Sequence, residues 1–110
     1  MKILLDENVD VRLKQGFAGS NHQVFTVRGL GWNGVKNGAL LKLMAENAFD
    51  VFIAVDKNLP YQQNLANLPV TVLILDVKRN TLATTRPFVP LILERLTQPV
   101  GKEVIVLSLS

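Results

Sequence analysis

Polar side chains with metal-binding chemistry follow two apolar runs of the sequence. The first run covers residues 3–5 and the second covers residues 51–54. The polar residues that come after these runs are Asp6, Glu7 and Asn8, then Asp56, Lys57 and Asn58. Carboxylate and amide oxygens are the ligands that Mg²⁺ and Mn²⁺ prefer in proteins. The two clusters are therefore candidates for one metal site. The alternative is that Asp6 or Asn8 caps the first helix, because Asp and Asn are common at turns and helix starts.

Short apolar runs also predict the strands that position these residues. The runs lie at residues 3–5, 24–27, 51–54, 70–75 and 104–107. They are continuous and do not alternate with polar residues, which is typical of parallel strands covered on both faces. Segments with helical spacing separate them, namely Val9 with Leu13 and Phe17, residues 40–48, and residues 82–96. Pro87 and Pro90 fit only the first turn of a helix, so the regular part of the last segment is expected from Arg86 to Thr97.

This alternation of strands and helices predicts a single α/β domain over residues 1–110. Right-handed crossovers place helices on both faces of the sheet. The expected fold is a three-layer α/β/α sandwich around a mostly parallel sheet of about five strands. Ligands of such sheets bind beyond the carboxyl ends of the strands. The polar clusters after the first and third strands are therefore expected to meet at that edge.

The composition limits the other functions that the chain could have. The absence of cysteine excludes disulfide scaffolds, thiolate metal sites and cysteine nucleophiles. The formal net charge of +3 is too small to indicate nucleic-acid binding by itself. No apolar run approaches the roughly 20 residues that a membrane span needs. We therefore expect a soluble, cytoplasmic protein with no membrane contact.

Three further features carry weaker signals. Residues 29–34 fit the pattern G-x-G-x-x-G, but turn-forming glycines beside Trp32 explain these letters better than a dinucleotide site does. His22, the only histidine, precedes the second strand and gives no support to a Ser-His-acid triad. Residues 58–64 combine Tyr61 with four amides. Such side chains either bind unpaired bases or belong to a capped helix start.

Four segments of the chain match a known pattern. They are Leu4-Leu5-Asp6-Glu7-Asn8-Val9, Gly31-Trp32-Asn33-Gly34, Lys36-Asn37-Gly38-Ala39-Leu40-Leu41, and Ala54-Val55-Asp56-Lys57-Asn58-Leu59 with Gln62-Gln63-Asn64. Together they resemble the short stand-alone PIN-like proteins, relatives of VapC-type toxins, over nearly the whole chain. The resemblance implies a nuclease fold whose acids hold Mg²⁺ or Mn²⁺ and whose substrate is single-stranded RNA. It also implies a toxin-antitoxin pair, with a small antitoxin protein as inhibitor, and a homodimer.

The resemblance carries over to individual positions. Asp6 and Asp56 match metal-binding acids of the family, and Glu7 stands beside the first of them. Two positions depart from the pattern: Asn37 stands where many relatives have an acid before the central helix, and Asn58 where nuclease relatives often carry Asp. Neutral oxygen ligands weaken the hold on a divalent ion without abolishing it.

The resulting hypothesis is a metal-dependent endoribonuclease, which is a hydrolase. Its catalytic residues are Asp6, Glu7 and Asp56; its metal ligands are Asp6, Asp56, Asn37 and Asn58; and its substrate contacts are Arg28, Lys57, Tyr61 and Gln62. The alternative is a catalytically degenerate PIN-like module that binds RNA or a protein partner without cleavage. A phospho-acceptor receiver domain ranks behind both. It needs a hydroxyl residue after the fourth strand and a lysine after the fifth, where this chain has Leu75-Asp76 and Leu107-Ser108.

Overall fold

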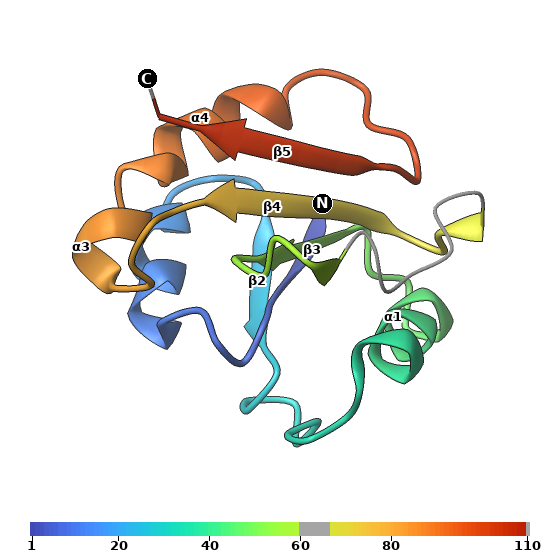
Figure 1. The fold of residues 1–110 in the computed structure, drawn as a ribbon. Coiled ribbons are helices and arrows are strands. Elements are labelled where there is room, and N and C mark those ends of the chain that lie inside the picture. The colour runs from blue at the N-terminus through green and yellow to red at the C-terminus, as the bar shows by residue number, and fades with distance from the viewer. Residues whose placement is uncertain (60–66, 110) are drawn as a thin grey trace.

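Five parallel strands form one sheet in the order β2-β1-β3-β4-β5 (Figure 1). The computed structural model describes residues 1–59 and 67–109. The strands are β1 (Lys2–Leu5), β2 (Gln23–Thr26), β3 (Val51–Ala54), β4 (Thr71–Asp76) and β5 (Val104–Ser108). All five coincide with the predicted apolar runs to within one residue at each end. The continuous runs form parallel strands because both faces of the sheet are covered.

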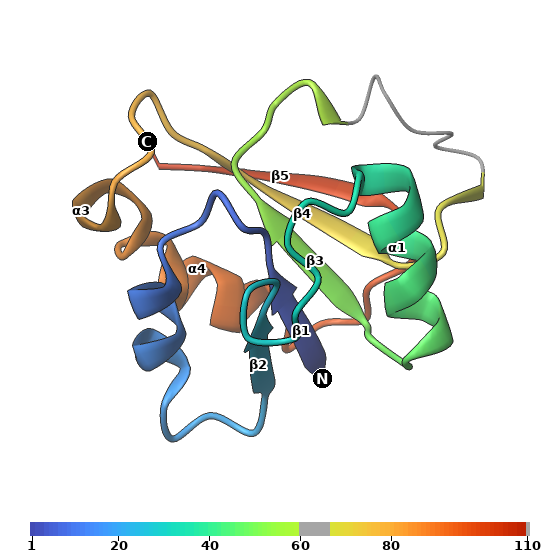
Figure 2. The same cartoon turned by 90° about the horizontal axis from the view of Figure 1, so that it is seen from below.

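Helices cover the two faces, as a three-layer sandwich requires. Helix α1 (Asn37–Glu46) packs on one face. The other face is covered by the 3-10 helix η1 (Val11–Phe17) together with α3 (Leu82–Thr85) and α4 (Phe88–Arg95). Figure 2 shows α1 on one side of the sheet and η1, α3 and α4 on the opposite side. The predicted fold class is confirmed.

The core divides into two clusters because the side chains of a strand point alternately to opposite faces. Ile3, Leu5 and Ile53 face η1 and α4. Leu4 and Phe52 face α1. All five are fully buried. Helices therefore pack on both faces of the sheet, and this packing holds the strand ends from which the candidate site residues follow.

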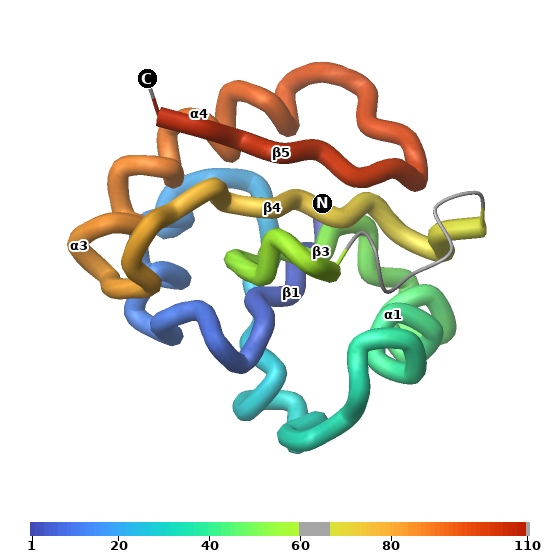
Figure 3. The backbone as a smooth tube through the Cα atoms, in the orientation of Figure 1, coloured from blue at the N-terminus to red at the C-terminus, as the bar shows by residue number. Residues whose placement is uncertain are grey.

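The chain changes direction next to β1. It runs from β1 outward to β2 and then crosses to β3 on the other side of β1, as Figure 2 shows; Figure 3 traces the same chain as a tube. Leu5 pairs with Thr26 on one side and with Ile53 on the other. This strand order is that of flavodoxin-like sheets, in which ligands bind at the point where the winding reverses. In this protein that point lies between the ends of β1 and β3.

The helices differ from the sequence prediction at two places. Asp10 caps η1, because its carboxylate accepts the backbone N–H of Arg12 at 2.9 Å. The suggestion that Asp6 or Asn8 caps the first helix is therefore wrong. The last helical segment consists of two pieces, α3 and α4, and Pro87 stands directly before α4. The helix predicted over residues 86–97 is longer than α4 by two residues at each end.

The glycine-rich segment after β2 is a turn, as predicted. Gly31 and Gly34 have φ angles of 74° and 79°, in the left-handed region that glycine adopts without steric cost. Between them, the ring of Trp32 packs edge-on against Phe49, with centroids 5.8 Å apart. Trp32 thus covers the face of the sheet that carries α1.

Candidate metal site at the carboxyl edge of the sheet

Asp6 lies at the reversal point of the sheet. It follows β1 directly, and its backbone N–H donates to the carbonyl of Ile53 in β3 at 2.9 Å. Its side chain is 7% exposed. The carboxylate oxygen Oδ1 accepts the backbone N–H of Glu7 at 2.9 Å, and the backbone carbonyl of Asp6 accepts the N–H of Val9 at 2.9 Å. Asp6 is therefore a buried acid in a tight turn.

The surroundings of Asp6 favour its protonated form. Burial raises its pKa above the usual value, the backbone N–H of Glu7 lowers it, and the negative charges of Glu7 and Asp56 raise it further. The negative charge at the end of β3 thus reaches Asp6 at the end of β1. An ionised Asp6 is thus poorly compensated, and a bound cation would relieve both its desolvation and its repulsion by the neighbouring carboxylates.

Asp56 is the second acid that the sheet brings to this edge. It is partly exposed, two residues after β3. Its Oδ1 accepts the backbone N–H of Asn58 at 2.9 Å, and its backbone carbonyl accepts the N–H of Leu59 at 3.2 Å. These bonds make a turn of the kind that the capping alternative proposes for such residues. Among the described residues, the hydrogen bonds to the carboxylates of Asp6 and Asp56 reach Oδ1, and none reaches Oδ2.

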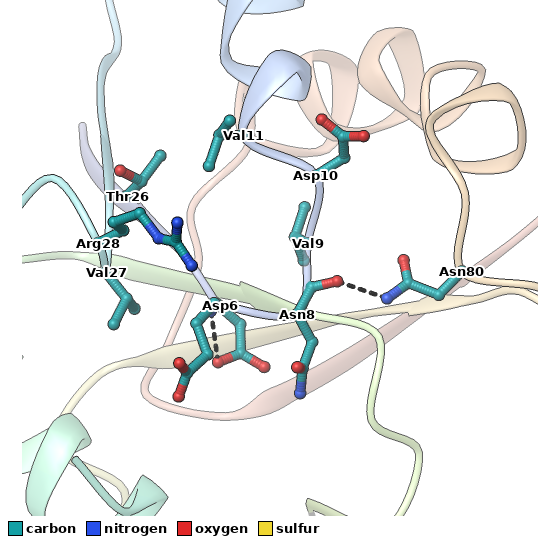
Figure 4. Close-up of a pocket in the computed structure, with 10 residues that line it drawn as sticks. Asp6, Asn8, Val9, Asp10, Val11, Thr26, Val27, Arg28 and Asn80 are labelled. Atoms are coloured by element: carbon teal, nitrogen blue, oxygen red, sulfur yellow. Dashed lines mark hydrogen bonds between the residues drawn. The ribbon is translucent and has the colours of Figure 1, made fainter. Parts of the chain in front are cut away.

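A hollow of about 370 Å³ lies beside Asp6, between η1 and the ends of β1 and β2. Its lining residues are Asp6, Glu7, Asn8, Val9, Asp10, Val11, Thr26, Val27, Arg28 and Asn80. Figure 4 shows the guanidinium of Arg28 extending into this hollow. Arg28 forms no ion pair with any residue that the structure describes. It is therefore a cation available to a ligand in the hollow.

Asp10 is held by a different arginine. The Arg12 guanidinium lies 2.6 Å from one carboxylate oxygen and donates to the other at 3.0 Å. Hydrogen bonds from the side chain and the backbone of Arg12 lower the pKa of Asp10 to about 2. Asp10 is thus an ionised, paired carboxylate in the wall of the hollow and is not a candidate ligand.

Lys57 is not among the residues that line this hollow. Its Nζ lies 2.5 Å from Oδ1 of Asp76, at the end of β4. Hydrogen bonding to Lys57 and its charge lower the pKa of Asp76. The hydroxyl of Ser108 at the end of β5 donates to the other oxygen of Asp76 at 3.4 Å. Lys57 therefore joins the ends of β3 and β4, and does not line the hollow beside Asp6.

The other predicted contacts are placed as follows. Asn37 is the first residue of α1, on the opposite face of the sheet from η1, and it does not line the hollow. The side chain of Asn58 is exposed. Tyr61 and Gln62 lie outside the described residues. The prediction for Asn37 and Asn58 as metal ligands thus gains no support from the geometry, while Asp6, Glu7 and Arg28 are brought together.

Sequence reasoning missed Asn80. It lies in the connection between β4 and α3, lines the hollow, and donates from Nδ2 to the backbone carbonyl of Asn8 (Figure 4). The sequence does contain a signal for this residue. Asn80 comes shortly after a predicted strand and directly before Thr81, which can cap a helix. The sequence prediction for this edge extends only to Asp76, which ends β4.

The acids fit a weakly held divalent ion better than a closed metal cage. In residues 1–59 and 67–109 no group of three or more His, Cys, Asp or Glu side chains is arranged to hold a metal. Mg²⁺ binds commonly through one or two carboxylates and keeps several water ligands, to which substrate phosphates add. Two carboxylates follow strands at this edge, those of Asp6 and Asp56, and they match that smaller requirement in number.

A scan of protein-family models finds no match to the chain, and searches of curated proteins and of solved structures find none either. The PIN-like relationship therefore stays a prediction from the sequence. In the part of the chain that the structure describes, no helix is long and apolar enough to cross a membrane.

Proposed function

We propose that this protein is a metal-dependent endoribonuclease acting on single-stranded RNA. The observation that carries the proposal is the buried carboxylate of Asp6 at the reversal point of the sheet, where the charge of Asp56 acts on it. Perturbed acids in such a position are candidates for function. The hollow with Arg28 supplies a neighbouring place for a phosphate. The resemblance to PIN-like proteins supports RNA as the substrate.

Each residue has a role in this proposal. Asp6 and Asp56 would hold Mg²⁺ or Mn²⁺ through their carboxylates. The ion, when bound, would supply Lewis-acid chemistry. Glu7, which is exposed beside Asp6, orients the attacking water and accepts its proton. Arg28 stabilises the negative charge that develops on the phosphate oxygens. Lys57 holds the ends of β3 and β4 through Asp76 and does not contact the phosphate.

The biological setting follows from the resemblance alone. We infer a cytoplasmic toxin of a toxin-antitoxin pair, inhibited by a small antitoxin protein and active as a homodimer. These statements are independent of the chemistry at Asp6. They would be addressed by the oligomeric state of the purified protein and by growth of cells that express it.

Metal titration and RNA cleavage test the enzymatic proposal together. Mn²⁺ binding to the wild type, Asp6→Asn and Asp56→Asn is measured by calorimetry, followed by incubation of each with single-stranded RNA. Glu46→Gln, which removes an exposed carboxylate at the end of α1, is the matched control. We expect binding and cleavage by the wild type and the control, and neither by the two aspartate variants. The absence of Mn²⁺ binding to the wild type at millimolar concentration would overturn the proposal.

A second candidate is a module that binds RNA or a protein partner without cutting. The observation in its favour is the absence, among the described residues, of a metal-holding group of three acids or histidines. It predicts RNA binding that weakens steeply with salt and persists in Asp6→Asn and Asp56→Asn, because phosphate contacts would supply the affinity. Cleavage by the wild type that both variants lose excludes this candidate.

A further inference from the structure

Asn80 ties two loops that are far apart in the sequence. Its Nδ2 donates to the backbone carbonyl of Asn8, 72 residues earlier (Figure 4). Asn8 belongs to the acidic loop, which we define as residues 6–10 between β1 and η1. This loop carries both Asp6 and Glu7. This hydrogen bond therefore ties the β4–α3 segment to the acidic loop, which carries the proposed site residues Asp6 and Glu7.

The acidic loop has few other ties to the rest of the molecule. Its ends are anchored, because Asp6 is bonded to Ile53 and the side chain of Val9 is 2% exposed. Glu7 and Asn8, in the middle, are exposed. Among the described residues, the side chain of Asn80 is the only group that hydrogen-bonds to the carbonyl of Asn8. The N–H of Val9 closes the turn on the carbonyl of Asp6, and the Asn80 amide ties the middle of this turn to the β4–α3 connection.

Asn80 is itself held firmly on both sides. The hydroxyl of Thr84 in α3 donates to the carbonyl of Arg79, the residue before it. Thr81, the residue after it, caps α3: its Oγ1 accepts the N–H of Thr84 at 3.2 Å, and its own N–H donates to Oγ1 of Thr84 at 3.1 Å. Thr85, fully buried, donates to the carbonyl of Thr81 at 3.0 Å. The amide of Asn80 is therefore presented from a fixed support.

We propose that Asn80 is a positioning residue that holds the acidic loop so that Glu7 stays beside the metal-binding carboxylate of Asp6. The proposal rests on the proposed metal site, and it adds the β4–α3 connection to the parts of the chain on which that site depends. Groups that orient metal ligands through hydrogen bonds change metal affinity without contacting the ion. Asn80 acts through the Asn8 carbonyl in this sense and is not itself a ligand.

The test compares three variants with the wild type. Asn80→Ala removes the donor, and Asn80→Gln keeps an amide donor on a longer side chain. Asn21→Ala is the matched control, because Asn21 is an exposed asparagine in the turn before β2, at the opposite edge of the sheet. The measurements are the Mn²⁺ dissociation constant by calorimetry, amide hydrogen exchange at Glu7, Asn8 and Val9, and the urea midpoint of unfolding.

We expect Asn80→Ala to weaken Mn²⁺ binding by about tenfold, the lower limit for loss of a group that orients metal ligands. Amide exchange at Glu7, Asn8 and Val9 should become faster, while the urea midpoint stays close to that of the wild type because Asn80 is exposed. Asn80→Gln should fall between Asn80→Ala and the wild type, and Asn21→Ala should change nothing. A merely structural role would instead lower the urea midpoint and leave the Mn²⁺ constant of the folded protein unchanged.

The hydrogen-exchange arm separates this inference from the proposed function. If the wild type binds no Mn²⁺, the metal proposal fails, and unchanged exchange in Asn80→Ala would then refute the positioning role as well. If the wild type binds Mn²⁺ and Asn80→Ala binds it equally well with unchanged exchange, Asn80 does not position the loop and only this inference is overturned.

Discussion

Replacement of Asp6 by asparagine should stabilise the protein in the absence of metal. Asp6 is 7% exposed, and its pKa is raised by burial and by the charges of Glu7 and Asp56. Asparagine has nearly the same shape and keeps an oxygen for the N–H of Glu7, which lies 2.9 Å from Oδ1 of Asp6. The asparagine side chain carries no charge. The variant therefore avoids the cost of burying an ionised group and the repulsion by Glu7 and Asp56.

The gain in the free energy of unfolding depends on how far hydrogen bonds offset the cost of burying the Asp6 carboxylate. A buried polar group that lacks partners costs about 1–3 kcal/mol, and the bond from Glu7 offsets part of this cost in the wild type. We expect the variant to gain about 1 kcal/mol at pH 7, or roughly 4 °C in Tm for a domain of this size.

The pH dependence identifies the cause of the gain. The folded protein holds the proton of Asp6 more tightly than the unfolded chain, whose carboxyl has the ordinary pKa of 3.8. Below that value both states of the wild type are protonated and the advantage of Asp6→Asn vanishes. As the pH rises through the raised pKa of the folded state, the wild type loses stability relative to the variant.

Thermal unfolding of both proteins at pH 3 and pH 7, in EDTA, is the assay, with Glu46→Gln as the control for loss of an exposed charge. Addition of Mn²⁺ at a hundred times its dissociation constant should stabilise the wild type by about 2.7 kcal/mol and leave the variant unchanged. The order of stability then reverses. The reasoning is refuted if Asp6→Asn unfolds below the wild type in EDTA by the same margin at both pH values.

Three further outcomes are expected. Hydrogen bonds from Arg12 lower the pKa of Asp10 to about 2. Asp10→Asn should therefore have a lower urea midpoint than the wild type at pH values above the ordinary carboxyl pKa, and this difference should shrink as the pH falls through about 2. Arg28→Gln should slow RNA cleavage by about tenfold or more, whereas Lys57→Gln should not, because Lys57 is paired at the end of β4; equal losses in a gel assay would contradict the assignment. Phe52→Ala should lower the free energy of unfolding in urea by about 3–5 kcal/mol, because Phe52 is fully buried, and a loss below about 1 kcal/mol would contradict its place in the core.

The strands could be predicted because their signal is local. Val51–Ala54 is an uninterrupted apolar run, and β3 is buried along its whole length. The shared carboxyl edge of parallel strands predicted that Asp6 and Asp56 follow strand ends on the same side of the sheet, without knowledge of the strand order. The order itself comes from the packing of α1 and η1 on opposite faces, which no local pattern specifies.

The parts that the sequence did not predict depend on tertiary contacts. The helical segment after Asp10 forms a 3-10 helix, and a Cβ atom on its Gly16 would lie 3.0 Å from a methyl carbon of Val89 in α4. That close approach is invisible until α4 is in place. Asn80 was missed for the same reason, because its role depends on a carbonyl group 72 residues away.

The strand order also decides when the site can form during synthesis. β1 is made first, but its partner β3 pairs with it through Ile3 and Val51, 48 residues later. Asn80 follows Asp6 by 74 residues, which takes a ribosome roughly 4 to 15 s at 5–20 residues per second. A nascent chain that ends before Asn80 contains Asp6 and Asp56 but lacks the amide that ties the acidic loop. The acidic loop can therefore take its tied position only after most of the chain has been made.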